Sequence, residues 1–292
     1  MTSIFSDYQQ RLKALLLFFD RFCRKNQITY SVCCGTLLGL IRHADIIPWD
    51  GDIDVVMTRK EYERFKKAFA NYSGRFYLED IYSKPFKSDK RRDFLSITAK
   101  LVDKKSNSPL FCIDIYTLDF LGNDFKKASV AVSKYKKYYH LAKFFLSFHL
   151  PPLRRTNSIF KNFIILMIHF FHPVLFLVFW IAKPLFIKSY SKFEKHYLSY
   201  DEKSKYCTLI PYYLKKIVVE ENFINGFIDL TFGNITVMAF RNYDLVLKKS
   251  YGEYMVLPPV EKRKPYPSET ELLKVSIESD EELNELLDSI NN

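Results

Sequence analysis

Three aspartates in two short apolar stretches are the residues of this 292-residue sequence whose types and spacing best suit catalysis. Asp52 and Asp54 are two residues apart in a β-prone run, so both carboxylates lie on one face of a strand. Like charges held that close repel each other unless a cation lies between them. Oxygen ligands suit Mg²⁺, which shares its coordination with substrate phosphates. Asp114, on a later predicted strand, can complete the site, and Asp50 joins it if the extended backbone begins there.

A glycine-containing turn precedes these aspartates at a predicted strand-to-helix junction. Such a junction presents unpaired backbone N–H groups and the positive end of a helix dipole, which together favour a phosphate. Gly35 allows close approach of the backbone, and Thr36 can cap the helix or donate a hydrogen bond. The pattern therefore predicts a metal site beside a phosphate site. The competing interpretation is an acidic turn that simply faces water.

The elements that must position these residues follow from hydrophobic periodicity. The sequence predicts helices at about Tyr8 to Lys25, from Leu37, from Thr58 to Asn71 behind a capping box, and from Asn242 to Ser250. It predicts strands at Ile28 to Cys33, Asp52 to Met57, Leu95 to Val102, Leu110 to Tyr116, Ile217 to Val219 and Ile235 to Ala239. The expected fold class is therefore α/β (α+β), a mixed sheet flanked by helices.

The same residues resemble the signature of the LicD family, which includes bacterial phosphocholine transferases and is similar to fukutin and fukutin-related protein. Four blocks carry the resemblance in order: Gly-Thr-Leu-Leu-Gly-Leu-Ile-Arg-His (35 to 43), Ile-Ile-Pro-Trp-Asp-Gly-Asp-Ile-Asp (46 to 54), Ile-Asp-Ile-Tyr-Thr-Leu-Asp (113 to 119), and Asn242-Tyr-Asp244 with Tyr251-Gly-Glu-Tyr-Met255 and Leu257-Pro-Pro259. The match spans about Ile28 to Pro259, and its basic, apolar middle is the least diagnostic part.

The resemblance implies a nucleotidyltransferase-like fold that transfers a phosphoalcohol from a cytidine diphosphate (CDP) donor to a glycan hydroxyl. By position, Asp52 and Asp54 are implied metal ligands for Mg²⁺ or Mn²⁺. Asp114 is the third carboxylate, which binds a second metal or accepts the proton of the acceptor hydroxyl. The alcohol remains open among choline, ethanolamine, ribitol and others. The acceptor is a glycan or lipid-linked glycan, as in lipopolysaccharide, capsule or teichoic acid biosynthesis.

Substrate contacts are expected around this centre. Gly35, Thr36 and Arg42 are expected to hold phosphate oxygens, and Tyr251 with Gly252 to shape the acceptor rim. A quaternary ammonium group needs aromatic faces. The candidates in matched blocks are Trp49, Tyr116, Tyr251 and Tyr254.

Two positions depart from the family pattern. Gly51 stands where family members often have a third acid, and Phe240 stands where a proline commonly occurs. Because Gly51 should face away from Asp52 and Asp54, we expect the metal site to survive and the substrate detail at the rim to differ.

A basic, apolar segment carries most of the net charge of +11. From Phe125 to Phe193 there are twelve Lys and Arg residues and no acid, which leaves 32 basic against 33 acidic residues elsewhere. This distribution argues against nucleic acid as a partner. The 21 uncharged residues between Lys161 and Lys183 are long enough to span a bilayer, but a crossing would separate Asp114 from the C-terminal block. We therefore expect a bent helical hairpin at the membrane surface, kinked at Pro173, with Pro184 as a second candidate for a kink. A buried helical subdomain is the alternative.

Composition and cysteine usage indicate how the chain is divided into domains and where in the cell the protein is located. We expect a catalytic core at 1-120, a membrane-interfacial helical insertion at 121-200, the C-terminal part of the catalytic domain at 201-267, and an acidic tail at 268-292. Five cysteines without zinc spacing and no secretory signal favour the cytoplasmic face of the membrane. Other functions left open are a nucleotidyltransferase that leaves the nucleotide on its product, a nucleotide-sugar glycosyltransferase, and a non-catalytic membrane-bound scaffold.

Overall fold

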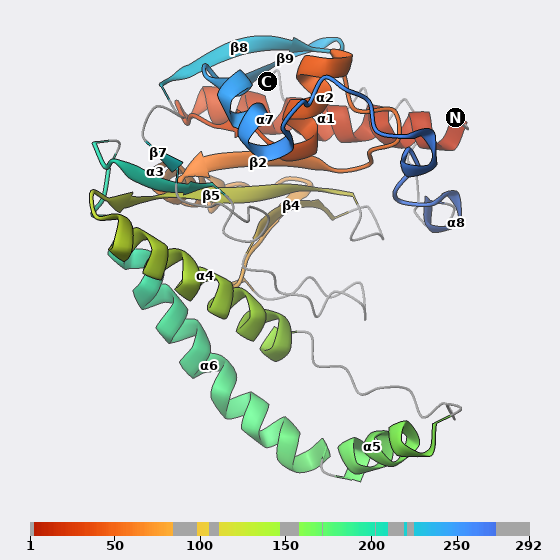
Figure 1. Cartoon of the computed structure of the whole chain (residues 1–292), viewed down its shortest axis with the longest axis vertical. Coiled ribbons are helices and arrows are strands. Elements are labelled where there is room, and N and C mark those ends of the chain that lie inside the picture. Colours follow the sequence, from red (N-terminus) through yellow and green to blue (C-terminus); the bar gives the residue numbers. More distant parts are fainter. Residues whose placement is uncertain are drawn as a thin grey trace.

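A mixed β-sheet with helices packed on it forms the body of the protein in the computed structural model (Figure 1). The structure describes residues 3–83, 98–104, 111–146, 158–170, 172–201, 203–209, 219–220 and 225–272. Within these residues the predicted α/β (α+β) class is confirmed. The predicted tail beyond residue 272 lies outside the described residues.

Helices and strands alternate from α1 to β3, and β3, β4 and β5 then follow one another. The helices are α1 (Ser3–Lys25), α2 (Cys34–His43), α3 (Arg59–Phe69), α4 (Phe125–Leu146), α5 (Ile159–Phe170), α6 (His172–Tyr197), α7 (Tyr243–Tyr251) and α8 (Glu269–Leu272), with a 3₁₀ turn at Val260–Lys262. The strands are β1 (Ser31–Val32), β2 (Ile53–Thr58), β3 (Phe76–Glu79), β4 (Ala99–Asp103), β5 (Cys112–Gly122), β6 (Tyr206–Leu209), β7 (Val219–Glu220), β8 (Phe227–Phe232) and β9 (Ile235–Phe240).

Strand β5 is the centre of the main sheet. It pairs in parallel with β2 along one edge. Along its other edge it pairs antiparallel with β4 over its first half and with β6 over its second half. The outer strands are β1 beside β2, β3 beside β4, and β7 beside β6. The chain therefore returns to the sheet that its N-terminal half began, after the long excursion through α4, α5 and α6.

The N-terminal helix is amphipathic, as its spacing predicts, and begins earlier than expected, at Ser3. Its inner face includes Leu12, Leu16 and Phe19, all fully buried. The β8–β9 hairpin packs against α1 and β1, and the Phe240 N–H donates to Ser31 Oγ at 2.9 Å. This contact ties the C-terminal block to the N-terminal core.

Several predicted boundaries are confirmed and others shift. The Thr58 hydroxyl caps α3 by accepting the Glu61 N–H, as the capping box predicts. Strand β5, however, continues to Gly122 instead of ending at Tyr116. Asp119, beyond the predicted strand end, is fully buried within β5, where it is paired with Arg59.

Three other strand predictions were too long or extend past the described residues. Strand β1 spans only Ser31–Val32 of the predicted Ile28 to Cys33. Residues 95–97 and 217–218 of two further predicted strands lie outside the described residues.

Helices α4, α5 and α6 form an arm that projects from the sheet, with α5 at its far end (Figure 1). Aromatic pairs hold α4 against α6, for example Tyr135 with Phe193 at 4.5 Å between ring centroids. Helix α5 ends at Phe170 and α6 begins at His172, and the two run in different directions, in line with the predicted kink near Pro173 (Figure 1). Pro184 lies inside α6. In the part of the chain that the structure describes, no helix combines the length and the apolar character needed to cross a membrane.

A buried ionic cluster fixes the base of this arm. The Arg59 guanidinium of α3 donates to both carboxylate oxygens of Asp119 on β5, at 2.7 Å each. It also pairs with Glu194 of α6, and Tyr135 of α4 donates its hydroxyl proton to Asp119. Side chains from α3, α4, α6 and β5 thus meet in one ionic cluster, which sets the direction in which the arm leaves the sheet.

Candidate active site

The structure places Asp54 and Asp114 side by side on the paired parallel strands β2 and β5. They are direct register partners, so their side chains lie on the same face of the sheet. Asp54 is buried, at 7% exposure, between the fully buried Ile53 and Val55. Lys100 on β4 is the register partner of Asp114 from the other side, and its ammonium lies 2.5 Å from Asp114 Oδ1. A cation and two carboxylates therefore form a row across three strands.

Asp52 and Asp50 extend this row into an acidic cluster. Burial raises the pKa of the Asp54 carboxyl well above its ordinary value, and the charges of Asp52 and Asp114 raise it further. Burial also raises the pKa of Asp52, with the charge of Asp114 adding to it, and the pKa of Asp50, with Asp52 adding to it. These carboxyls are therefore close enough to repel one another, which is the electrostatic environment that a divalent cation relieves.

The donor set fits a hard cation, although the side chains do not form a closed cage. Among the described residues, no three His, Cys, Asp or Glu side chains are grouped so that they enclose a metal ion by themselves. Mg²⁺ in phosphoryl-transfer sites is commonly held by one or two carboxylates together with waters and substrate phosphates. An open acidic site beside a phosphate site is compatible with that mode of binding.

The first turn of α2 lies directly against the acidic cluster. The Thr36 hydroxyl accepts the Asp54 N–H at 2.8 Å, so Thr36 fixes the backbone that carries Asp54. A Cβ atom at Gly35 would lie 2.5 Å from Asp50 Oδ2, so the glycine allows this carboxylate to approach the helix start. Cys34 adopts a left-handed backbone conformation with a φ of +51°, which is uncommon for a residue with a Cβ atom. The turn predicted to hold phosphate thus adjoins the aspartates.

A rim of side chains from α2, β5 and the C-terminal block adjoins Tyr251, which lies near the acidic cluster. Burial raises the pKa of the Tyr251 hydroxyl, and the charges of Cys34 and Asp54 add to this effect, so the hydroxyl lies near the acidic cluster. Gly252 ends α7 with a φ of +67° and has open space around its Cα. Tyr116 is partly buried, and its pKa is raised by burial and then by Asp54, whereas the Tyr251 side chain is 46% exposed.

Arg42 belongs to the same rim. Its Nη1 donates to the Tyr254 carbonyl at 3.1 Å. Burial lowers the pKa of Arg42, and the nearby charge of Arg263 lowers it further. Arg263 lies over the Trp49 ring at 5.7 Å and donates to the Pro258 carbonyl at 2.8 Å. Neither guanidinium forms an ion pair within the described residues, so two neighbouring cations lack a carboxylate partner.

Three residues of this region were missed by sequence reasoning. Lys100 stands alone as a charge in the predicted strand Leu95 to Val102, and that pattern was the available signal. Arg263 follows the last matched block and carries no local signal. Tyr8 of α1 donates its hydroxyl proton to the Gly51 carbonyl at 3.0 Å, a contact across 43 residues that only the tertiary fold creates.

Gly51 has a packing role at the start of β2. A Cβ atom there would lie 2.4 Å from the Tyr266 carbonyl oxygen and 2.6 Å from Pro267 Cδ. The segment at 266–267 therefore covers the face on which an acidic side chain at position 51 would stand. This close approach of the C-terminal segment explains why position 51 carries no third acid, and Gly51 contributes no side chain to the cluster.

A mixed sheet with carboxylates on paired parallel strands, beside a glycine-containing helix start, is an arrangement suited to holding a metal-bound phosphate. The model of the LicD/FKTN/FKRP nucleotidyltransferase domain matches residues 27–158, so this stretch is similar to that family. The chain is similar to the lipopolysaccharide cholinephosphotransferase LicD of Haemophilus influenzae, with 29% identity over 265 residues, which cover 86% of this chain and 91% of that protein. The resemblance to the LicD family is thereby confirmed.

Proposed function

We propose that this protein is a metal-dependent transferase of phosphoalcohol groups, of the phosphocholine type. The donor is CDP-linked, and the acceptor is a hydroxyl of a cell-surface glycan or its lipid-linked precursor. The similarity to a lipopolysaccharide cholinephosphotransferase supports the reaction class. The observation that carries the proposal is the register pairing of Asp54 with Asp114, with Asp52 in electrostatic contact with both.

The acidic cluster and the arginine pair suit the two parts of a metal-bound diphosphate. Asp52 and Asp54 would hold Mg²⁺ or Mn²⁺, which would neutralise charge on the donor diphosphate. Arg42 and Arg263 donate hydrogen bonds to phosphate oxygens, since arginine prefers such anionic partners and neither has one among the described residues. Their positive charge stabilises the negative charge that develops on the leaving cytidine monophosphate (CMP).

The acceptor hydroxyl attacks the phosphorus atom that carries the alcohol. A new P–O bond forms there, the bond to the bridging oxygen breaks, and CMP leaves with that oxygen. We assign the proton of the acceptor hydroxyl to Asp114, whose carboxylate Lys100 holds in place at 2.5 Å. For an alcohol with a quaternary ammonium group, Tyr116 is the aromatic side chain nearest the carboxylates by sequence and register. Arg263 already lies over the Trp49 ring.

The experiment that tests this function is incubation of the purified protein with a glycan acceptor, Mg²⁺ and a panel of CDP-alcohols. We expect release of free CMP with one or a few donors, and loss of turnover when a chelator removes the metal, with recovery on adding Mg²⁺ or Mn²⁺. Asp229→Asn is the matched control and should retain turnover. It changes an exposed carboxylate on β8 that pairs with Arg24 of α1. Nucleotide retained on the acceptor would instead identify a nucleotidyltransferase, and turnover only with nucleotide sugars a glycosyltransferase.

We also propose that the arm docks on the cytoplasmic face of a membrane. Its far end exposes large apolar side chains, with Phe160 at 72% and Phe170 at 75% exposure on α5, and Leu185 at 64% on α6. Lys161 is exposed among them and suits anionic headgroups. A membrane-docked arm would bring the catalytic sheet to a lipid-linked acceptor.

Replacing Phe163 and Phe170 by aspartate should weaken vesicle binding on the order of a hundredfold. The change removes roughly 3 kcal/mol of apolar burial, which corresponds to about a hundredfold in affinity. Co-sedimentation with vesicles that contain anionic phospholipid measures the effect. Leu245→Asp, at an exposed apolar position on α7 outside the arm, is the matched control and should bind like the unchanged protein. Equal binding by the double variant would contradict the docking proposal.

A further inference from the structure

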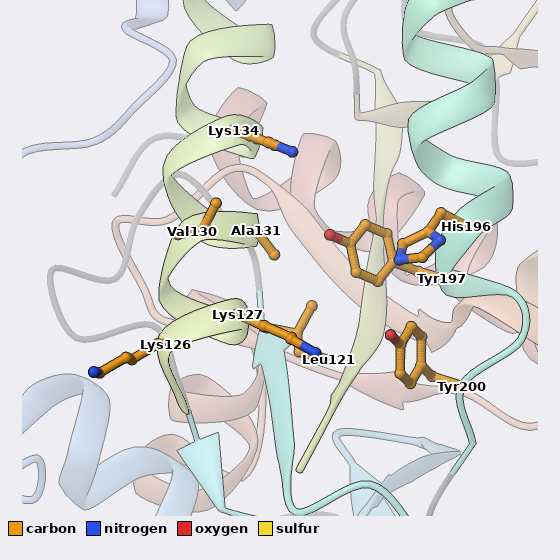
Figure 2. Close-up of a pocket in the computed structure, with 9 residues that line it drawn as sticks. All are labelled: Leu121, Lys126, Lys127, Val130, Ala131, Lys134, His196, Tyr197 and Tyr200. Atoms are coloured by element: carbon orange, nitrogen blue, oxygen red, sulfur yellow. The ribbon is translucent and has the colours of Figure 1, made fainter. Parts of the chain in front are cut away.

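A second cationic site lies at the base of the arm, away from the aspartates. A pocket of about 320 Å³ opens between the start of α4 and the end of α6 (Figure 2). Its lining residues are Leu121, Lys126, Lys127, Val130, Ala131, Lys134, His196, Tyr197 and Tyr200. Leu121 is seven residues from Asp114 along β5, which places the pocket roughly 20 Å from the acidic cluster.

The pocket has a cationic wall and an aromatic wall. Lys127 and Lys134 of α4 extend toward the tyrosine rings, whereas Lys126 extends away (Figure 2). On the facing wall the rings of Tyr197 and Tyr200 stack with centroids 6.0 Å apart, and His196 packs on both. The aromatic wall is held in place from below, because a Cβ atom at Gly122 would lie 2.8 Å from the Tyr200 ring.

Two of the three lysines lie where the helix dipole disfavours a positive charge. Lys126 and Lys127 stand in the first turn of α4. Asp124 accepts the backbone N–H groups of both residues at 2.8 and 3.1 Å, so its carboxylate caps the helix, and it does not line the pocket. Within the described residues, none of the three lysines forms an ion pair, and no acidic side chain lines the pocket.

A phosphate group complements these walls. Its oxygens accept hydrogen bonds from ammonium groups and from a tyrosine hydroxyl. Burial raises the pKa of Tyr197 to about 12, and Asp119 adds to this effect, so the hydroxyl keeps its proton and can donate. The volume admits a phosphate with a small attached group, and is near the lower end for small-molecule sites.

We propose that this pocket binds a phosphate-bearing group, either a soluble phosphomonoester or the phosphate of an anionic lipid headgroup. The site is separate from the proposed transfer reaction and does not rest on it. Because the pocket is at the root of the arm, its occupant contacts α4, α6 and the end of β5 together.

The test is protection of lysines from acetylation in the full-length protein, mapped by mass spectrometry. Inorganic phosphate and glycerol 3-phosphate form one arm, and vesicles with and without phosphatidylglycerol form the other. We expect saturable protection of Lys127 and Lys134. Protection by the soluble probes assigns a soluble phosphomonoester, and protection by anionic vesicles alone assigns a lipid headgroup.

A pair of matched variants separates the pocket from general surface charge. Lys127→Gln with Lys134→Gln should weaken binding of the protecting probe about thirtyfold. Lys136→Gln with Lys137→Gln removes the same charge from exposed positions of the same helix outside the pocket, and should leave binding unchanged. Equal loss in the two variants, or no protection of Lys127 and Lys134 by any probe, would overturn the proposal.

Discussion

Replacing Asp54 by asparagine should lower kcat/KM for CMP release on the order of a thousandfold while the protein stays folded. Asp54 is the buried member of the row in which Asp114 and Lys100 also lie. Asparagine keeps the size of the side chain but removes the negative charge that a divalent cation requires. Added Mg²⁺ should then fail to restore turnover.

The stability of the same variant provides an independent check. Burial, with the charges of Asp52 and Asp114, raises the pKa of Asp54 in the folded state. The ionised carboxylate therefore destabilises the metal-free fold at pH values above the unfolded-state pKa of about 3.9. Asparagine removes this penalty, so Tm of the metal-free protein at neutral pH should stay the same or rise. Mg²⁺ should raise Tm of the unchanged protein more than that of the variant.

Asp229→Asn serves as the control for both measurements, because it removes an equivalent charge from an exposed surface pair. Near-normal turnover in Asp54→Asn would contradict the assignment of the acidic cluster as the catalytic centre. A variant that fails to fold would instead contradict the stability argument, and circular dichroism distinguishes the two outcomes.

Replacing Arg59 by methionine should destabilise the fold by about 3 to 5 kcal/mol, which corresponds to a fall in Tm of roughly 10 °C. The substitution leaves the Asp119 carboxylate, at 0% exposure, without its cationic partner. Glu194 of α6 loses the same partner, so the base of the arm is weakened as well. Denaturant unfolding at neutral pH measures the loss.

Two further variants establish the cause. Arg64→Met removes an arginine from the exposed side of the same helix, where it pairs with Glu61, and should cost about 0.5 kcal/mol or less. Adding Asp119→Asn to Arg59→Met should recover part of the stability, because the unpaired buried charge is then gone. A loss in Arg59→Met no greater than in Arg64→Met would show that the ionic cluster does not hold the arm.

The elements with strong local signals were predictable from sequence. Helix α3 follows from its capping box, and α1 from its apolar spacing, because both signals act within a few residues. The course of β5 beyond Tyr116 was not predictable. Asp119 lies beyond the predicted strand end, and only Arg59, 60 residues away along the chain, makes its burial possible.

The candidate site shows the same division. Asp52, Asp54 and Asp114 could be proposed from residue type and alternation, since the side-chain period of a strand is a local property. Lys100 and Arg263 could not be given roles in this way. Lys100 reaches Asp114 through strand pairing, and Arg263 reaches Arg42 through the return of the C-terminal block.

The sequence by itself determined which residues carry chemistry, which stretches alternate or repeat as strands and helices, and which family the chain resembles. Each of these depends on side-chain identity over short separations. Only the tertiary structure decided that β2 and β5 are parallel neighbours in register and that Gly51 lies beneath Tyr266 and Pro267. It also decided that lysines of α4 face Tyr197 and Tyr200 at and just after the end of α6. Those contacts join residues far apart along the chain, and their partners are selected by packing of the whole core.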